Sequence, residues 1–266
     1  MQLSLASKIA LITGGSRGIG AATVRMFVAA GAKVLFNYQS AKQRAEDVVR
    51  ACGAENCHAV QCDLSSIEAA ERLVEAAITK FGRLDILVVN HGIWPAKDMP
   101  VDRMSDEQWQ QTVDVNLNSV FGLVKHAVAQ MKNQGGSPEG GSAEPSSPAG
   151  HIVLVSSTAG QRGEAFHCDY AATKGALISM VKGLSTELAR HRIYINCVAP
   201  GWIDTDMAAP ALSDPATRAK VFGTIPLGRV GKPEEIAAPI LFLCTPHAGF
   251  ITGEVFNVNG GAVLVG

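Results

Sequence analysis

A glycine-rich turn near the N-terminus constrains the fold of this chain more than any other feature. An apolar run at residues 8–12 ends at the segment 13–20 (TGGSRGIG), and a helical pattern follows. The glycines of this turn let the backbone bend tightly and approach a pyrophosphate, whose charge a helix N-terminus favours; they are Gly14, Gly18 and Gly20. Strand, glycine-rich turn and helix in this order predict a dinucleotide site. The alternative is a tight turn between strand and helix that binds nothing.

Strand and helix patterns alternate along the whole sequence. The run at 84–92 (LDILVVNHG) is almost continuously apolar, which is typical of a strand buried on both faces of a parallel sheet. Alternation of this kind predicts an α/β fold with one doubly wound parallel sheet and helices on both faces, in a single domain spanning residues 1–266. Besides 8–12 and 84–92, strands are expected at 33–38, 57–64, 151–156, 194–200 and 254–259. Helices are expected at 42–52, 66–80, 105–131 and 233–244 and after Tyr170.

Two segments depart from this alternation. Residues 133–150 (NQGGSPEGGSAEPSSPAG) contain no large apolar side chain, so we expect a flexible low-complexity insertion within the domain. Residues 201–222 follow a strand and are rich in small, polar and proline residues. A long loop at this place is a candidate for a mobile lid.

Composition narrows the class of protein. The chain has 266 residues, of which 47% are hydrophobic and 18% charged, and a formal net charge of −1. It is long enough to bury a core without disulfides or metal, and it lacks the basic block of a nucleic-acid-binding protein. No signal peptide or membrane-spanning run is evident, so we expect a cytoplasmic protein. Six cysteines without C-x-x-C spacing predict reduced thiols rather than zinc ligands or disulfides: Cys52, Cys57, Cys62, Cys168, Cys197 and Cys244.

The end of the second expected strand bears on the choice of cofactor. An NAD-binding protein of this kind carries Asp or Glu there to accept the ribose 2′-hydroxyl, whereas this chain has Asn37-Tyr38-Gln39-Ser40, with Lys42 just beyond. No carboxylate would repel a 2′-phosphate, and Arg17 in the glycine-rich turn can reach toward one. Charge therefore favours NADP(H) over NAD(H). The alternative is that Asn37 and Ser40 merely end a strand.

A hydroxyl, a phenol and an ammonium follow one another between residues 157 and 174. If the end of this segment is helical, Tyr170 and Lys174 lie four residues apart on one face. The ammonium is then expected to lower the tyrosine pKa from about 10. Such a tyrosine exchanges a proton with an alcohol or carbonyl oxygen, to which Ser157 could donate a hydrogen bond. By itself, a Tyr-x-x-x-Lys pair is more often a surface helix contact.

Three further polar residues stand at places where a ligand would bind. Asp63 could accept a hydrogen bond from an adenine amino group, and Asn90 and Gly92 follow a strand at the edge of the sheet where α/β proteins bind ligands. Asn116 lies among apolar neighbours within the helix expected at 105–131, an unfavourable place for an amide. It either caps a local kink or holds a water molecule.

Taken in order, these motifs resemble the short-chain dehydrogenase/reductase family over essentially the whole chain except 133–150. The chain is most similar to the group that contains the β-ketoacyl-carrier-protein reductases and their relatives. The segments that carry this similarity are 16–20, 116–121, 251–254 and 258–261. The resemblance implies a Rossmann-type fold and an NADP(H)-dependent oxidoreductase that interconverts a ketone, such as a 3-oxoacyl thioester, and a secondary alcohol by hydride transfer.

The resemblance also implies a role for each matching residue. Tyr170 would be the acid–base, Ser157 would orient the substrate carbonyl, and Lys174 would bind the nicotinamide ribose while lowering the tyrosine pKa. Asn116 would hold a water molecule in a proton relay. The implied cofactor contacts are Gly14, Ser16, Arg17, Gly18, Ile19, Gly20, Asn37, Tyr38, Ser40, Asp63, Leu64, Asn90, Gly92, Tyr170, Lys174, Pro200, Gly201, Ile203 and Thr205.

Two departures from the family pattern bear on the substrate. His91 stands where the family has a small residue, and it either packs as a satisfied side chain or shapes the substrate pocket. Carrier-protein reductases are described as having basic residues near the active-site entrance, whereas the matching segment 147–151 is poor in fixed positive charge. This lowers the expectation of an acyl-carrier-protein substrate without excluding it. The resemblance implies a homotetramer built through the helix at 105–131 and the helix after Tyr170.

The expected substrate is a small carbonyl compound or alcohol. Large apolar side chains in the loops 94–104 and 202–222 favour an apolar ligand; they are Trp94, Trp202, Met207 and Phe222. The alternatives are a non-catalytic dinucleotide sensor and an NAD-dependent alcohol or sugar dehydrogenase of the same family. The complete Ser–Tyr–Lys set disfavours the sensor, and the chain has no room for the separate substrate domain of nucleotide-sugar epimerases.

Overall fold

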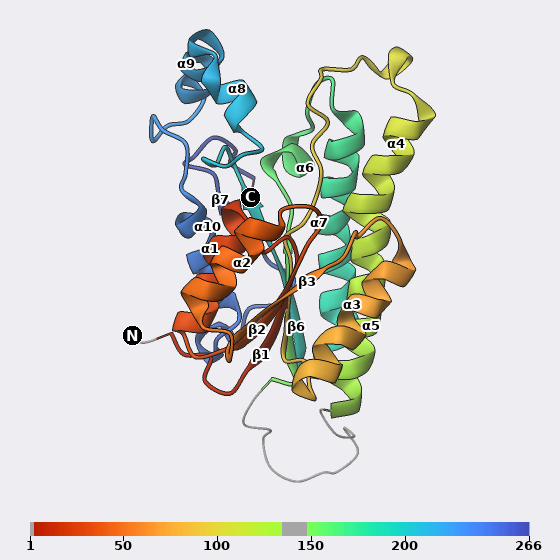
Figure 1. Cartoon of the computed structure of the whole chain (residues 1–266). Coiled ribbons are helices and arrows are strands. Elements are labelled where there is room, and N and C mark those ends of the chain that lie inside the picture. Colours follow the sequence, from red (N-terminus) through yellow and green to blue (C-terminus); the bar gives the residue numbers. More distant parts are fainter. Residues whose placement is uncertain (1–2, 135–147, 266) are drawn as a thin grey trace.

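Seven parallel strands run through the centre of the computed structural model, which describes residues 3–134 and 148–265 (Figure 1). Their order is β3-β2-β1-β4-β5-β6-β7, and every adjacent pair is parallel. The predicted α/β fold with a doubly wound parallel sheet is confirmed. The strands are β1 (Ile9–Ile12), β2 (Lys33–Tyr38), β3 (Cys57–Gln61), β4 (Ile86–Val89), β5 (Gly150–Val155), β6 (Ile193–Pro200) and β7 (Val255–Val258).

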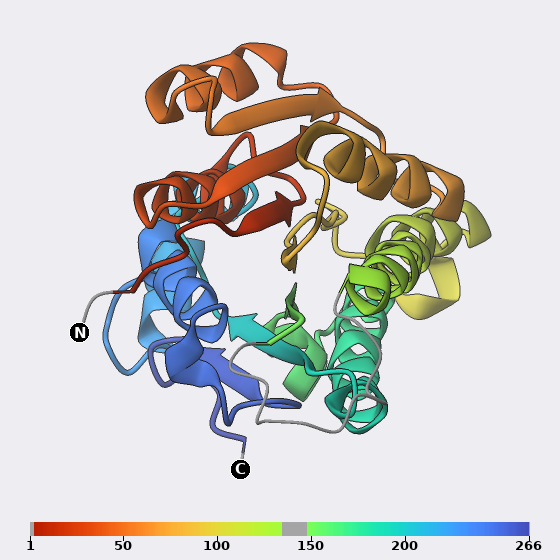
Figure 2. The ribbon, with the colours of Figure 1, turned by 90° about the horizontal axis from the view of Figure 1, so that it is seen from below.

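Helices cover both faces of the sheet (Figure 2). One face carries α1 (Gly18–Ala29), α2 (Lys42–Cys52) and α10 (Pro233–Leu243), and the other carries α3 (Ile67–Phe81), α5 (Ser119–Gln134) and α7 (Cys168–Ala189). A hydrophobic core lies between the sheet and the helices on each face. Successive side chains of a strand point to opposite faces, so Ile12 of β1 packs in the core beneath α1, α2 and α10, and Leu11 packs in the core beneath α3, α5 and α7. Both faces of the central strands are therefore buried, which explains their continuous apolar runs.

The helix expected at 105–131 is interrupted by one wide turn. It consists of α4 (Asp106–Val113), the π-turn η2 (Asp114–Asn118) and α5. The Ser105 side chain caps α4 by accepting a hydrogen bond from the Gln108 backbone N–H (3.2 Å). Asn116 lies within the π-turn and is fully buried. Wide turns of this kind are frequent at functional sites, so the odd position of this amide coincides with a local distortion of the helix.

Part of the predicted loop at 201–222 is helical. Two short helices, α8 (Ala209–Ser213) and α9 (Pro215–Gly223), occupy its second half, so the prediction of a continuous irregular loop is wrong there. Asp214 caps α9, since its carboxylate accepts a hydrogen bond from the Thr217 backbone N–H (2.8 Å). Proline at the first position of a helix is favourable. Pro215 therefore begins a helix rather than continuing a loop.

The insertion predicted at 133–150 is narrower at both ends. Asn133 and Gln134 belong to the last turn of α5, and Gly150 begins β5; residues 135–147 lie outside the described residues. The end of α5 and the start of β5 lie at the lower edge of the molecule in Figure 1, the edge from which the parallel strands begin. Of the remaining predicted strands, 57–64 ends at Gln61 and 84–92 is shortened to β4.

The remaining short elements are α6 (Thr158–Arg162) and the two 3-10 turns η1 (Val101–Arg103) and η3 (Pro246–Ala248). All six cysteines are free thiols. None of the helices in the described part of the chain is long and apolar enough to cross a bilayer.

Candidate active site

A cavity of about 1260 Å³ opens at the carboxyl ends of the strands, beside the point where the strand order reverses between β1 and β4. This is the place where ligands bind in open α/β sheets. Nearly all the predicted site residues line it. The exceptions are Gly20, Ser40 and Asn116, which lie outside its lining.

The glycine-rich turn forms one end of the cavity as a cradle, with most of residues 14–19 lining it. Gly14 and Gly18 have positive φ angles, +66° and +51°, which glycine adopts without strain. Arg17, the N-cap of α1, makes no side-chain capping bond with any described residue, and the first turn of α1 carries no acidic residue. A Cβ on Gly20 would lie 2.1 Å from the Gly14 carbonyl oxygen. The cradle therefore fits a pyrophosphate at a helix N-terminus.

Two asparagines hold this cradle against the neighbouring strands. The Asn37 side chain accepts a hydrogen bond from the Gly14 backbone N–H and donates one to the Cys62 carbonyl, both at 2.9 Å. The Asn90 side chain donates to the Thr13 carbonyl (3.1 Å). Both amides line the cavity, but the amide oxygen and nitrogen of Asn37 are already engaged within the chain. Asn37 thus does more than end a strand.

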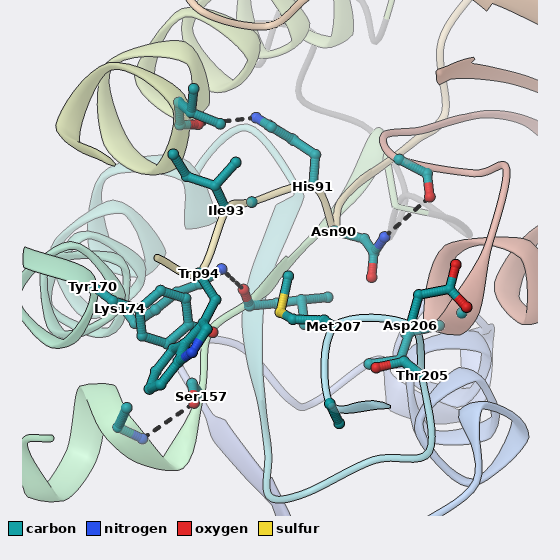
Figure 3. A pocket seen from close by; sticks show the side chains of 18 of the residues that line it. Asn90, His91, Ile93, Trp94, Ser157, Tyr170, Lys174, Thr205, Asp206 and Met207 are labelled. Atoms are coloured by element: carbon teal, nitrogen blue, oxygen red, sulfur yellow. Dashed lines mark hydrogen bonds between the residues drawn. The ribbon is translucent and has the colours of Figure 1, made fainter. Parts of the chain in front are cut away.

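Three of the four predicted catalytic side chains, Ser157, Tyr170 and Lys174, meet at the opposite end (Figure 3). Tyr170 and Lys174 lie in the first turns of α7, so the expected helical spacing is confirmed. Ser157 caps α6 by accepting a hydrogen bond from the Ala159 backbone N–H (3.1 Å), and its hydroxyl is hydrogen-bonded to Tyr170. The adjacent Ser156 instead donates to the Lys174 carbonyl (2.7 Å). Of these two serines, it is therefore Ser157 whose hydroxyl interacts with the Tyr170 phenol.

The expected lowering of the tyrosine pKa by Lys174 is wrong for this structure. Burial raises the pKa of Tyr170 to about 12, and the hydrogen bond with Ser157 opposes this only in part. Burial also lowers the pKa of Lys174 to about 8. The Lys174 Nζ lies 5.7 Å from the centre of the Tyr170 ring and donates to the Val155 carbonyl (2.9 Å). Tyr170 therefore keeps its proton at neutral pH, which is the state of a proton donor.

The lowered pKa of Lys174 predicts a pH dependence of stability. Between about pH 8 and about pH 10 the unfolded chain, with an ordinary lysine pKa, binds more protons than the folded protein. The free energy of unfolding should therefore rise with pH across this window through Lys174. We expect the difference in urea unfolding free energy between the wild type and Lys174→Met to increase from pH 7.5 to 9.5. Unfolding free energies of the two proteins that change in parallel with pH would contradict this prediction.

His91 is a packed and satisfied side chain. Its Nδ1 faces the Thr13 hydroxyl (2.8 Å), and its Nε2 faces the Val115 carbonyl (3.1 Å) and the Ser119 hydroxyl (2.8 Å). The Thr13 oxygen already accepts from the backbone N–H groups of Asn90 and His91 (2.9 and 3.2 Å), so its proton goes to Nδ1 and Nε2 carries the ring proton. Burial, followed by the charge of Lys174, lowers the His91 pKa to about 3. His91 therefore ties the end of β4 to the π-turn as a neutral ring.

Asn116 serves the loop after β4. Its side chain accepts a hydrogen bond from the Ile93 backbone N–H (2.8 Å) and donates one to the Ile93 carbonyl (2.9 Å). These two bonds fix the backbone just beyond Gly92. The water-holding role implied for Asn116 stays a prediction.

Sequence reasoning missed an ion-pair cluster at the cofactor end. The Asp206 carboxylate, in the segment before α8, contacts the guanidinium of Arg44 on α2 and lies 3.6 Å from that of Arg17. Lys42, the cation noted in the sequence, lies 3.9 Å from Glu46 instead. Arg44 lies two residues beyond Lys42, but nothing local in the sequence signals its contact with a residue 162 positions away.

Trp94 is the main apolar surface at the catalytic end. Its ring stacks on His167, with 3.9 Å between centroids, and meets Tyr170 edge-on at 4.7 Å. His167 is fixed in turn by the Pro95 carbonyl (2.9 Å). Trp202 and Met207 also line the cavity, as predicted, whereas Phe222 lines a separate hollow between α8 and α9. The prediction for Phe222 is wrong because α9 carries it away from the sheet.

Comparison with known proteins identifies the family. The family model described as enoyl-(acyl carrier protein) reductase matches residues 14–263. The 3-oxoacyl-[acyl-carrier-protein] reductase of Synechocystis sp. is 37% identical over 265 residues, which cover 98% of this chain and 99% of that protein. The corresponding reductase FabG of Escherichia coli is 38% identical over 264 residues, which cover 99% of this chain and all of that protein.

Solved structures agree with this assignment. A short-chain dehydrogenase/reductase from Brucella melitensis, titled as a glucose/ribitol dehydrogenase, superposes with a TM-score of 0.87 and 34% identity, covering 100% of both chains. A blue fluorescent protein from a metagenomic library, solved in complex with NADPH, has a TM-score of 0.85 and 32% identity, covering 98% of this chain and 100% of that one. This chain belongs to the short-chain dehydrogenase/reductase family.

Proposed function

We propose that this protein is an NADP(H)-dependent oxidoreductase that reduces a ketone to a secondary alcohol, with Tyr170 as the proton donor. One observation carries the proposal: Ser157, Tyr170 and Lys174 meet at one end of a cavity whose other end is a glycine cradle for a pyrophosphate. An oxidoreductase of this class needs both ends in one cavity, because the cofactor and the carbonyl must meet there.

The cavity fits NADP(H) in its donors and its charge. Residues 14–19 would hold the pyrophosphate, Asp63 the adenine, Asn90 and Lys174 the nicotinamide ribose, and Ile203 and Thr205 the carboxamide. Arg17 and Arg44, which pair with Asp206 in this structure, would supply the guanidinium groups for a 2′-phosphate, and the end of β2 carries no carboxylate. The NADPH bound to the metagenomic relative supports the same choice. When bound, the cofactor supplies the hydride.

Side chains of this chain supply the proton and stabilise the phenolate that its loss leaves behind. Tyr170 is protonated at neutral pH, as its raised pKa requires, and it would give its proton to the substrate oxygen as negative charge develops there. The hydrogen bond of Ser157 stabilises the phenolate that remains. Lys174, held by the Val155 carbonyl, places a cation beside the same group.

Initial-rate kinetics test the proposed function. NADPH and NADH are each offered with a panel of carbonyl compounds: acetoacetyl-CoA, the N-acetylcysteamine thioester of acetoacetate, and neutral aryl ketones. Turnover with NADPH supports the proposal. A strong preference for NADH would contradict the cofactor assignment, and binding of NADPH without turnover of any carbonyl would favour the sensor alternative.

The Asp206 cluster yields a prediction for cofactor affinity. Its carboxylate occupies the guanidinium pair that a 2′-phosphate requires, so Asp206→Asn should bind NADPH more tightly, by about two- to fivefold for exposed ion pairs. NADH, which lacks the phosphate, should bind unchanged in a fluorescence titration. Glu46→Gln removes the carboxylate next to Lys42 on α2 and serves as the control. Equal weakening of both cofactors would instead mean that Asp206 orders its loop.

We also propose that the chain forms a homotetramer as a single domain. Trp109 on α4 and Phe121 on α5 expose large apolar surfaces, as do Phe250 and Phe256 near β7. Exposed aromatic groups on two separate sides of one subunit suit two different contacts. Sedimentation or light scattering measures the state of assembly directly.

A further inference from the structure

Carboxylates surround the catalytic end of the cavity. Asp106 and Glu107 in the first turn of α4, Asp114 in the π-turn and Glu164 after α6 all line it. Besides the buried Lys174, Arg162 is the only basic residue that lines this end in the described chain, and it forms an ion pair with Glu164 (2.7 Å). The mouth of the site is therefore acidic.

The negative charge at this mouth is not neutralised by neighbouring cations. No ion pair among the described residues includes Asp106, Glu107 or Asp114. Within residues 3–134 and 148–265, the Asp114 carboxylate accepts hydrogen bonds only from neutral amides, those of Gln110 (2.9 Å) and Asn118 (2.7 Å). The nearby loop at 94–104 adds no net charge, because Lys97 and Arg103 balance Asp98 and Asp102.

The wall behind the acidic mouth is apolar. Ile93, Trp94 and Met207 line the cavity (Figure 3), and so do Val115 and Pro210. Trp94 is held between His167 and Tyr170, so its position is fixed against the catalytic phenol. A ligand bound beside Tyr170 therefore shares the cavity with these carboxylates and contacts aromatic and aliphatic side chains.

We propose that the substrate is an uncharged, apolar carbonyl compound, and that the acidic mouth selects against acyl groups presented on a polyanionic carrier such as coenzyme A or an acidic carrier protein. This inference rests on the proposed function. Like charges in a cleft with low-dielectric walls lower the rate of encounter. The chain thus departs in specificity from relatives that are named for carrier-bound substrates.

Two thioesters of the same acyl group test this inference. Acetoacetyl-CoA and the N-acetylcysteamine thioester of acetoacetate present the same ketone, but only the first carries phosphates. At low salt, kcat/KM should be about tenfold lower for the CoA thioester. The gap should narrow as salt rises from about 10 mM to about 1 M, over which the Debye length falls from about 30 to about 3 Å. 4-Acetylbenzoate and its methyl ester form a second pair that differs in one charge.

A charge reversal with a matched control separates electrostatics from stability. Glu107→Lys places a cation at the mouth, and Glu68→Lys makes the same change at the same helical position of α3, away from the cavity. In both helices the serine at the N-cap accepts a hydrogen bond from a backbone N–H of the first turn at 3.2 Å. In both, hydrogen bonds from the glutamate's own backbone N–H and from that serine's hydroxyl lower the pKa of the glutamate. Both variants therefore lose a comparable favourable interaction with the helix N-terminus.

The expected results differ between the two variants. Glu107→Lys should raise kcat/KM for the CoA thioester about three- to tenfold and leave kcat/KM for the N-acetylcysteamine thioester unchanged. Glu68→Lys should leave kcat/KM unchanged for both thioesters. A wild-type rate for acetoacetyl-CoA that equals or exceeds that of the uncharged thioester, or that falls with added salt, would overturn the inference. Failure to reduce any uncharged carbonyl with NADPH would instead overturn the proposed function itself, and the inference with it.

Discussion

Replacing Tyr170 with phenylalanine is expected to lower kcat for carbonyl reduction by about 10²- to 10⁴-fold, the range for loss of a general acid. The change removes the phenolic hydroxyl, which carries the transferable proton, and leaves the ring packed against Trp94. NADPH should still bind, because the glycine cradle and the arginine pair lie at the other end of the cavity. Initial rates and a fluorescence titration of NADPH measure the two effects separately.

Tyr194→Phe is the matched control for this variant. Tyr194 lies on β6 outside the cavity lining and packs edge-on against His151, so its loss of a hydroxyl should leave kcat unchanged. If Tyr170→Phe retained more than about a tenth of the wild-type kcat, another group would have to supply the proton, and the assignment of Tyr170 would be wrong.

Gly20→Ala is expected to lower stability and to weaken NADPH binding at least tenfold. A Cβ at this position would lie 2.1 Å from the Gly14 carbonyl oxygen and 2.7 Å from the Asn90 side-chain nitrogen. Neither neighbour can move freely, since Gly14 is held by Asn37 and Asn90 by Thr13. Overpacking of this kind costs about 1–3 kcal/mol, and the cradle must shift to relieve it. Urea unfolding and a NADPH titration measure both effects.

Gly183→Ala makes the same chemical change where space is available. Gly183 lies within α7, and a Cβ there meets nothing within 4 Å. Alanine should therefore stabilise the protein by about 0.5–1 kcal/mol, because glycine is a poor helix former. Similar effects of the two substitutions on stability and on NADPH binding would contradict the close packing described for Gly20.

Local sequence patterns predicted most of the fold. The central strands are buried on both faces, so their apolar runs are continuous and easy to find, and β2 and α2 have the predicted ends. The glycine-rich turn was predictable because its spacing is tied to one backbone geometry. Segment 201–222 was harder to interpret, since proline and aspartate favour loops and helix starts equally; Asp214 and Pro215 begin α9.

The candidate site was predictable as a set of residues but not in its electrostatics. Spacing on one helix places Lys174 near Tyr170, yet the direction of the tyrosine pKa shift depends on burial by Trp94 and other distant residues. The same holds for the contact between Arg44 and Asp206, which joins two elements with no local relation. The partners of His91 likewise come from two segments that are distant from it in sequence, the end of β1 and the junction of η2 with α5.

The hydrogen-bonded ring of His91 has a consequence for how this sequence can evolve. A small residue at position 91 would leave the Thr13 hydroxyl proton without its acceptor in the protein interior, at a cost of about 1–3 kcal/mol. A compensating loss of the Thr13 hydroxyl would in turn leave the backbone N–H groups of Asn90 and His91 without their hydrogen-bond acceptor. Positions 13 and 91 are therefore expected to be epistatic, and a mutational path away from histidine must change both together or pass through a less stable intermediate.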